Sequence, residues 1–296
     1  MKKAAYYLLD VFTKEKFHGN PLAIFPDARW IDTALLQPIA AELNLSETVF
    51  LYPKDASGVF PMRIFTPKME LPIAGHPTIG TGFFLSRELD HPVNGSISFL
   101  LKAKIGEVPV VVTFEDNVPQ TTRMTFPRPT FGEVLEDRQM LTEVLGLSPD
   151  DLLELPTQAV SCGVPFLIIP LRSIDAVQRI RFNMEIWQRY RKVLDPYFIY
   201  AFAPQGELAT SQLHGRMFAP QAGILEDPAT GAANAPLAAY CHHYGVMSGP
   251  LVSEQGFEMG RRSLLEIEAH AEEKGISGVS VGGDCVFVGA GELFID

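Results

Sequence analysis

Two residues that exchange protons readily stand at matching places in a repeated stretch of the sequence. His76 lies in "GHPTIGTG", residues 75–82, and Asp227 lies in "EDPATGAA", residues 226–233. Each precedes a proline, and the two stretches align without a gap. An imidazole and a carboxylate at equivalent positions could carry out unlike proton chemistry on one ligand.

The match extends beyond this pair of stretches. In the same order, "HGNPLAIFP" (18–26) matches "CGVPFLIIP" (162–170), "ETVFLYP" (47–53) matches "FIYAFAP" (198–204), and "RIFTP" (63–67) matches "RMFAP" (216–220). Four matches in the same order indicate an internal duplication. Arg63 and Arg216 repeat as well, and either could clamp a substrate carboxylate or support the core.

Each copy predicts the order strand, strand, helix, strand, strand, helix. Runs of β-branched and aromatic residues that end at a proline are typical of strands. The stretch 31–43 places apolar residues on one helical face, with Asp32 as its N-cap and Pro38 as a probable kink. In the second copy the corresponding helix opens at Asn183.

The last helix of each copy is apolar nearly all round and rich in glycine and alanine, which predicts a helix buried inside its domain. Pro77 and Pro228 are expected near the first helical position. If both helix N-termini face one cleft, their N–H groups and dipoles would bind an anion, most simply a small carboxylate. His76 and Asp227 would then lie on opposite sides of it. Each also has a simpler interpretation as a helix cap.

Composition narrows the class of protein. The chain has 296 residues, 47% hydrophobic and 20% charged, and a net charge of −11 without a run of Lys or Arg. This argues against nucleic acid as a partner. We expect no membrane span and no signal peptide. Three scattered cysteines suit a reducing compartment, so we expect a cytoplasmic protein. His214, His242 and His243 lack metal-ligand spacing, so no metal is expected.

Several motifs together resemble the PhzF family of phenazine-biosynthesis isomerases. They are "FHGNPLAIF", "NLSETVF", "RIFTPKMELPIAGHPTIGTG", "EDPATGAA" and a late "QGFEMGRRS". The resemblance implies an α/β, diaminopimelate-epimerase-like fold with two pseudo-symmetric halves, each a mixed sheet around a central helix. It also implies a homodimer without a cofactor. The family's best-understood member isomerises a dihydro-hydroxyanthranilate by moving a proton along a conjugated ring.

The resemblance assigns roles to particular residues. The glutamate of the family's "SET" motif, which acts as acid and base, falls on Glu47, with His76 and Asp227 as further catalytic residues. A carboxylate in that role must be partly desolvated. Where the known member has a serine, this chain has Ala232. We expect contacts with a small carboxylate substrate from the following residues: Ser46, Gly75, Thr78, Gly231 and Ala232.

Two other functions remain open at this point. One is a small-carboxylate binding protein that has lost the chemistry. The other is an epimerase that uses two thiols as opposed bases, but none of Cys162, Cys241 and Cys285 opens a central helix. We expect the first half to span residues 1–118 plus the C-terminal strand 284–296, the second half to span 119–283, and a linker to lie around "EDNVPQ".

Overall fold

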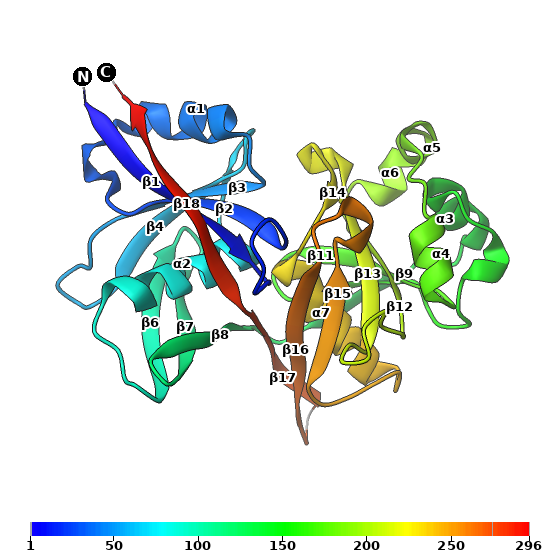
Figure 1. The fold of residues 1–296 in the computed structure, drawn as a ribbon. Helices are drawn as coiled ribbons and strands as arrows, with labels where there is room; N and C mark the ends of the chain where they lie inside the picture. The colour runs from blue at the N-terminus through cyan, green and yellow to red at the C-terminus, as the bar shows by residue number, and fades with distance from the viewer. Residues whose placement is uncertain (1, 274, 296) are drawn as a thin grey trace. The chain divides into compact units, whose positions relative to one another are not determined.

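The chain folds into two compact units, each of which wraps strands around a central helix (Figure 1). The computed structural model describes residues 2–273 and 275–295. One unit comprises Met1–Thr125 with Gly282–Asp296, and the other comprises Phe126–Val281.

The first unit holds most of the N-terminal elements and the C-terminal strand. Its strands are β1 (Lys3–Val11), β2 (Asn20–Phe25), β3 (Glu47–Leu51), β4 (Phe60–Phe65), β5 (Glu70–Leu71), β6 (Gly95–Ala103), β7 (Gly106–Glu115), β8 (Val118–Phe126) and β18 (Cys285–Phe294). Its helices are η1 (Ala28–Trp30), α1 (Thr33–Leu43) and α2 (Gly75–Glu88).

Helix α2 is the core of this unit, and it is buried from Gly75 to Ser86. Two of its glycines allow strands to approach closely. A Cβ on Gly80 would lie 2.5 Å from the Leu22 side chain, and one on Gly82 would lie 2.5 Å from the Val110 side chain. The strands can therefore close around the helix only because these positions lack a side chain.

The second unit holds the remaining elements. Its strands are β9 (Thr130–Val134), β10 (Gln158–Ser161), β11 (Pro165–Pro170), β12 (Phe198–Ala203), β13 (Leu213–Ala219), β14 (Ile224–Asp227), β15 (Leu251–Gln255), β16 (Ser263–Glu272) and β17 (Gly275–Gly283). Its helices are α3 (Arg138–Leu145), η2 (Pro149–Asp151), α4 (Ile174–Arg179), α5 (Met184–Arg189), α6 (Arg191–Leu194), η3 (Pro220–Ala222), α7 (Gly231–His243) and η4 (Phe257–Met259). Helix α7 is its buried central helix.

The strand pairings of the two units correspond one to one. In the first unit β2 pairs parallel with β3, β3 antiparallel with β4, β4 antiparallel with β5, and β4 parallel with β6. In the second, β11 pairs parallel with β12, β12 antiparallel with β13, β13 antiparallel with β14, and β13 parallel with β15. In each unit the central helix follows the same antiparallel pair. The predicted fold of two related halves with a mixed sheet around a central helix is confirmed.

The residues expected to form a linker have a different structure. Asp116 and Asn117 both have left-handed backbone, with φ of 49° and 66°, and they join β7 to β8. This is the conformation of a tight two-residue hairpin turn, so "EDNVPQ" is a hairpin and not a linker. The boundary between the compact units lies after Thr125. Strand β18 pairs antiparallel with β1, beginning with Lys3 opposite Phe294 (Figure 1).

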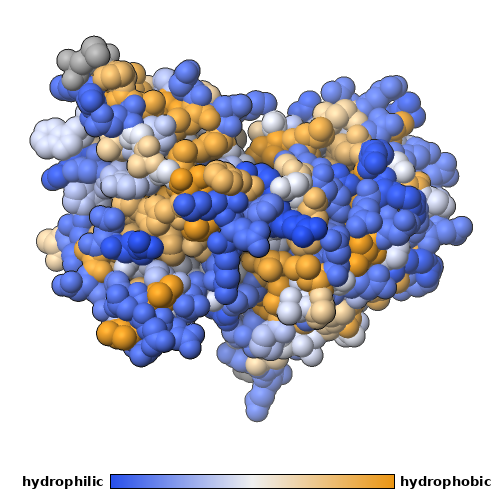
Figure 2. All heavy atoms as spheres, in the orientation of Figure 1, coloured by the Kyte–Doolittle hydropathy of each residue, from blue (hydrophilic) through white to orange (hydrophobic). Residues whose placement is uncertain are grey.

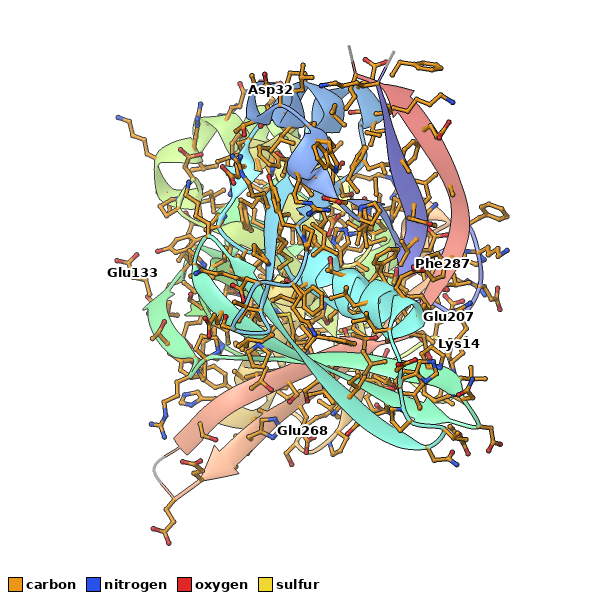
Figure 3. The ribbon with its side chains drawn as sticks, turned by 90° about the vertical axis from the view of Figure 1, so that its left-hand side faces the viewer. Lys14, Asp32, Glu133, Glu207, Glu268 and Phe287 are labelled. Carbon is orange, nitrogen blue, oxygen red and sulfur yellow. The ribbon has the colours of Figure 1, made fainter. Side chains whose placement is uncertain are left out.

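Two of the predicted helix starts are confirmed. The Asp32 carboxylate at the start of α1 (Figure 3) accepts a hydrogen bond from Ala34 N, and Asn183 accepts one from Ile186 N at the start of α5. Helix α7 begins later than expected, at Gly231 with Thr230 as N-cap. Pro228 therefore lies before the helix, and Asp227 ends β14 and does not cap α7.

The face of the molecule drawn in Figure 2 is mainly hydrophilic, with smaller hydrophobic areas between the hydrophilic ones. None of the helices in the described ranges is long and apolar enough to cross a membrane.

The repeated arginines make equivalent ion pairs that support the sheets. Arg63 on β4 binds both carboxylate oxygens of Glu70 on β5, at 2.7 and 2.9 Å. Arg216 on β13 binds both oxygens of Glu226 on β14, at 2.7 and 2.8 Å, and it also donates to the carbonyls of Val177 and Ile180. Both guanidinium groups are thus engaged within their own unit, which favours the supporting role over a substrate clamp.

A buried histidine between two glutamates joins β13, β15 and η4. His214 Nδ1 lies 2.7 Å from Glu254 Oε2, and its Nε2 lies 2.8 Å from Glu258 Oε1. Burial alone would lower the pKa of His214, but the hydrogen bonds to both glutamates outweigh it and raise the pKa to about 9 from 6.5. The imidazole is therefore protonated at neutral pH and compensates the buried carboxylates.

We expect the two arginine pairs to differ in their contribution to stability. The Arg216 and Glu226 side chains are 9% and 16% exposed, against 32% and 23% for Arg63 and Glu70. Arg216→Met should lower the free energy of unfolding by ~3–5 kcal/mol, since it leaves a buried carboxylate unpaired. Arg63→Met should cost ~1 kcal/mol. Urea denaturation measures both, and equal losses would contradict the assignment.

Stability should also depend on pH through His214. Because its pKa is higher in the folded protein, its contribution is fully present below pH 6.5 and is lost as the pH rises through 9. The shift corresponds to roughly 3 kcal/mol. The difference in unfolding free energy between the parent and His214→Gln should therefore shrink over this range. His243→Gln, at an exposed histidine of the same unit, controls for the substitution itself. A pH-independent difference at His214 would show that the imidazole is not protonated.

Candidate active site

The structure brings together two of the predicted catalytic residues. Glu47 is the first residue of β3, and His76 is the second residue of α2. His76 Nδ1 lies 3.3 Å from Glu47 Oε2, and the two side chains are 4% and 12% exposed. The duplication makes this pair specific to the first unit, because the residues at the matching positions in the second are Phe198 and Asp227.

Burial keeps the imidazole of this pair neutral. Desolvation lowers the pKa of His76 to about 3, against a weaker upward effect of the Pro21 carbonyl. A neutral imidazole offers one N–H donor and one acceptor nitrogen. His76 can therefore lie beside the Glu47 carboxylate without adding a positive charge that would suppress its basicity.

The N-terminus of α2, which contains His76, has backbone N–H groups that no side chain caps. Its N-cap is Ala74, so no side chain caps the helix, and the first turn has no acidic residue. The hydroxyl of Thr78 donates to the Ala74 carbonyl at 2.7 Å. The side-chain proton of Thr78 is thus already used, whereas the dipole of the helix favours an anion near Gly75 and His76. Ser46 is half-buried next to Glu47.

Asp227 belongs to a hydrogen-bonded network in the second unit. Its carboxylate accepts a hydrogen bond from the Thr230 hydroxyl, and its carbonyl accepts one from Gln255 Nε2 at 2.8 Å. Asp227 is 5% exposed, and Gln255 is fully buried. The Pro228 carbonyl in the same turn accepts a bond from the Ser263 hydroxyl at 2.9 Å.

The start of α7 resembles that of α2. Thr230 is its N-cap, but the Thr230 side chain makes no capping bond, and the first turn has no acidic residue. Gly231 is buried, whereas Ala232 is half-buried and presents a methyl group. Residues 228–230 form the turn into α7, so Asp227 directly precedes this turn and Ala232 is the second residue of the helix that follows it.

Sequence reasoning missed Gln255 and Asn234. Gln255 lies in the "QGFEMGRRS" stretch, which served only to recognise the family, and Asn234 lies one turn inside a helix that reads as apolar. The signal in the sequence for Asn234 is an amide in an otherwise apolar helix. A buried amide needs partners for both its oxygen and its nitrogen, so it indicates a network.

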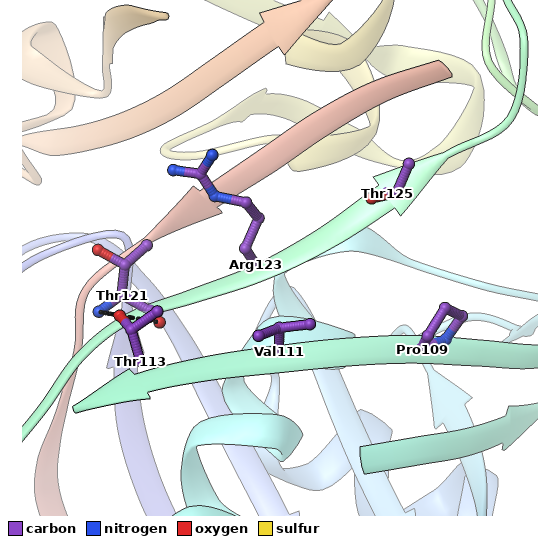
Figure 4. Close-up of a pocket in the computed structure, with 6 residues that line it drawn as sticks. All are labelled: Pro109, Val111, Thr113, Thr121, Arg123 and Thr125. Carbon is purple, nitrogen blue, oxygen red and sulfur yellow. Dashed lines mark hydrogen bonds between the residues drawn. The ribbon is translucent and has the colours of Figure 1, made fainter. Parts of the chain in front are cut away.

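Two surface pockets are lined by other residues. One, of about 350 Å³, lies over β7 and β8 and is lined by Pro109, Val111, Thr113, Thr121, Arg123 and Thr125 (Figure 4). The other, of about 420 Å³, lies in the second unit near His242, His243 and Phe131. Neither includes a predicted site residue.

The cysteines are poorly suited to act as bases. Burial raises the pKa of Cys162 and of Cys241 to about 12, and it raises the pKa of Cys285 as well. A thiol is a useful base only when a substantial fraction is thiolate. The two-thiol epimerase therefore has no support in the geometry. Among the described residues, no group of three or more His, Cys, Asp or Glu is arranged to hold a metal ion.

Known proteins resemble this chain over its whole length. It is 35% identical to a protein of Mesorhizobium japonicum named as an uncharacterized isomerase, covering 100% of both chains. It is 30% identical to the trans-2,3-dihydro-3-hydroxyanthranilate isomerase of Pseudomonas fluorescens, covering 98% of this chain and 99% of that one.

Solved structures show the same fold. The Bacillus anthracis phenazine biosynthesis protein of the PhzF family superposes with a TM-score of 0.90 at 26% identity, covering 100% of both chains. A probable proline racemase from Agrobacterium radiobacter K84 superposes with a TM-score of 0.65 at 12% identity over 99% of this chain and 93% of that one, which shows the epimerase-like fold alone.

The sequence pattern of the PhzC-PhzF family, described as phenazine biosynthesis-like protein, matches residues 9–291. With the paired topology of the two units and the isomerases among its relatives, this match places the chain in the PhzC-PhzF family of phenazine biosynthesis-like proteins.

Proposed function

We propose that this enzyme is a cofactor-independent isomerase that moves a proton within a small unsaturated or cyclic carboxylic acid. The observation that carries the proposal is the contact between the Glu47 carboxylate and a neutral, buried His76. The name of the Pseudomonas fluorescens relative, an isomerase of dihydro-hydroxyanthranilate, supports a substrate of this class.

Glu47 would act as both base and acid. As a carboxylate it removes a proton from one carbon of the substrate, and as a carboxylic acid it returns that proton to another carbon of the conjugated system. The number of protons is unchanged, so no co-reactant is needed. His76 stays neutral throughout, so it adds no positive charge that would weaken Glu47 as a base.

The start of α2 would bind the substrate's own carboxylate. Its first turn has neither a capping side chain nor an acidic residue, and a helix N-terminus of this kind favours an anion. Gly75 would allow the ligand to approach the backbone closely. The participation of Ser46, Thr78, Asp227, Gly231 and Ala232 stays a prediction, as do the homodimer and the cytoplasmic location.

Replacing Glu47 by glutamine tests the proton transfer directly. Glu47→Gln keeps the size of the side chain but removes the group that accepts a proton. With trans-2,3-dihydro-3-hydroxyanthranilate in D₂O, we expect binding within a few-fold of the parent but deuterium incorporation reduced ~10²-fold or more. Mass spectrometry measures the incorporation, and the exposed α1 variant Glu42→Gln is the control. Undiminished exchange in Glu47→Gln would exclude the proposed role. Binding without turnover in the parent would favour a carboxylate-binding protein.

Ala232 offers a test of substrate choice. A serine at this half-buried position could hydrogen-bond to a substrate oxygen, which a methyl group cannot do. We expect Ala232→Ser to raise kcat/KM for the same dihydro-hydroxyanthranilate by about fivefold, equivalent to ~1 kcal/mol. Ala209→Ser, at an exposed position, should change nothing. Efficient turnover by the parent, or no gain from the serine, would show that Ala232 does not set specificity.

A further inference from the structure

The orientation of the Gln255 side-chain amide is fixed by its partners. Gln255 Oε1 lies 3.1 Å from the backbone N of Thr230 and 3.0 Å from Asn234 Nδ2. A backbone N–H can only donate, so the atom facing it must be the oxygen. Asn234 Nδ2 is fixed in turn, because it also donates to the Thr230 carbonyl at 3.0 Å.

The direction of the next hydrogen bond follows from this orientation. Gln255 Nε2 faces the Asp227 carbonyl at 2.8 Å and the Thr230 hydroxyl at 3.0 Å, so it donates one proton to each. The Thr230 hydroxyl is an acceptor in this bond, and its single proton is left for the Asp227 carboxylate. The amide thus determines that Asp227 Oδ2 is an acceptor.

The Thr230 side chain makes this bond and does not cap helix α7. It occupies the N-cap position of α7, where a threonine hydroxyl ordinarily accepts from an N–H of the first turn and contributes ~1 kcal/mol. Here the side chain makes no capping bond. A threonine that donates to a carboxylate instead of capping its helix is more typical of a functional site than of a turn that only supports the fold.

We infer that Gln255 and Thr230 are positioning residues that hold the Asp227 carboxylate in one orientation as a hydrogen-bond acceptor. The Gln255 amide donates to the Thr230 hydroxyl, which donates to the Asp227 carboxylate, and we call this chain of two hydrogen bonds the relay. The inference rests on the proposed function only where it assigns Asp227 a part in catalysis.

The relay can be tested in the protein without a ligand. Thr230→Val keeps the shape of the side chain and removes the hydroxyl, whereas Thr230→Ser keeps the hydroxyl. With aspartate labelled by ¹³C at Cγ, we expect the Asp227 resonance in Thr230→Val to move and to titrate at higher pH than in the parent, since a hydrogen bond to the charged form is lost. Thr230→Ser should behave like the parent. Thr210→Val, at an exposed threonine of the same unit, controls for the substitution itself.

A second variant tests the amide. Gln255→Glu is equal in size but puts an oxygen where Nε2 donates, so it should change the Asp227 resonance in the same direction as Thr230→Val. Folding of each variant is checked by the remaining aspartate resonances. An Asp227 resonance that is unaltered in both Thr230→Val and Gln255→Glu would overturn the relay.

Turnover separates the relay from the proposed function. With trans-2,3-dihydro-3-hydroxyanthranilate as probe, Thr230→Val should lower kcat about tenfold or more with little change in KM, and Thr230→Ser should restore it. If the Asp227 resonance moves but kcat does not change, the hydrogen bond from Thr230 exists but catalysis does not depend on it. The assignment of Thr230 as a positioning residue for catalysis would then be wrong. If the parent itself does not act on the probe, the proposed function fails for this substrate, and the resonances alone decide whether the relay exists.

Discussion

The structure depends on the burial of one helix, except for its C-terminal residues, inside each unit. A helix enclosed by strands satisfies its internal backbone groups but leaves the N–H groups of its first turn without helical partners. In α2 and α7 no side chain caps these groups, and no acidic residue stands in the first turn. Buried, uncapped N–H groups are costly unless something polar meets them. The N-terminus of each central helix therefore favours a negative charge as a consequence of how the core of its unit is built.

The duplication supplies the scaffold, and the chemistry proposed above depends on residues that differ between the copies. The paired strands and the bidentate Arg–Glu bridges of Arg63 and Arg216 recur in both units. The proton-exchanging residues do not. At matching positions the first unit has Glu47 and His76, and the second has Phe198 and Asp227. Burial then acts on them differently, because His76 becomes a neutral partner of Glu47, whereas Asp227 is surrounded by donors from Thr230 and Gln255.

The sequence predicts the duplication, the central helices and the position of Glu47 well, because each is carried by local pattern and by repetition. It places the start of α7 at Pro228, although the helix begins at Gly231, since Asp227 pairs with Met217 across β13 and β14 and so belongs to a strand. That pairing is a tertiary contact which propensity does not report. The sequence does not distinguish the turn at Asp116 and Asn117 from a linker, because polar residues occur in both, and only the left-handed backbone tells them apart. Gln255 could not be assigned, because its partners on α7 and in the preceding turn are remote in sequence.

The second unit contains buried charged side chains around His214 and around Arg216. His214 is charged because two carboxylates surround it, and Arg216 is held by Glu226 and two backbone carbonyls. Such groups add little net stability compared with apolar packing, but each allows only one arrangement of its donors and acceptors. Glu254, which binds His214, directly precedes Gln255 on β15. The strand residue that anchors the charged network is therefore next to the residue that orients the Asp227 turn. Because Glu254 and Gln255 are neighbours on β15, a displacement of this strand would disturb the His214 cluster and the Asp227 turn together.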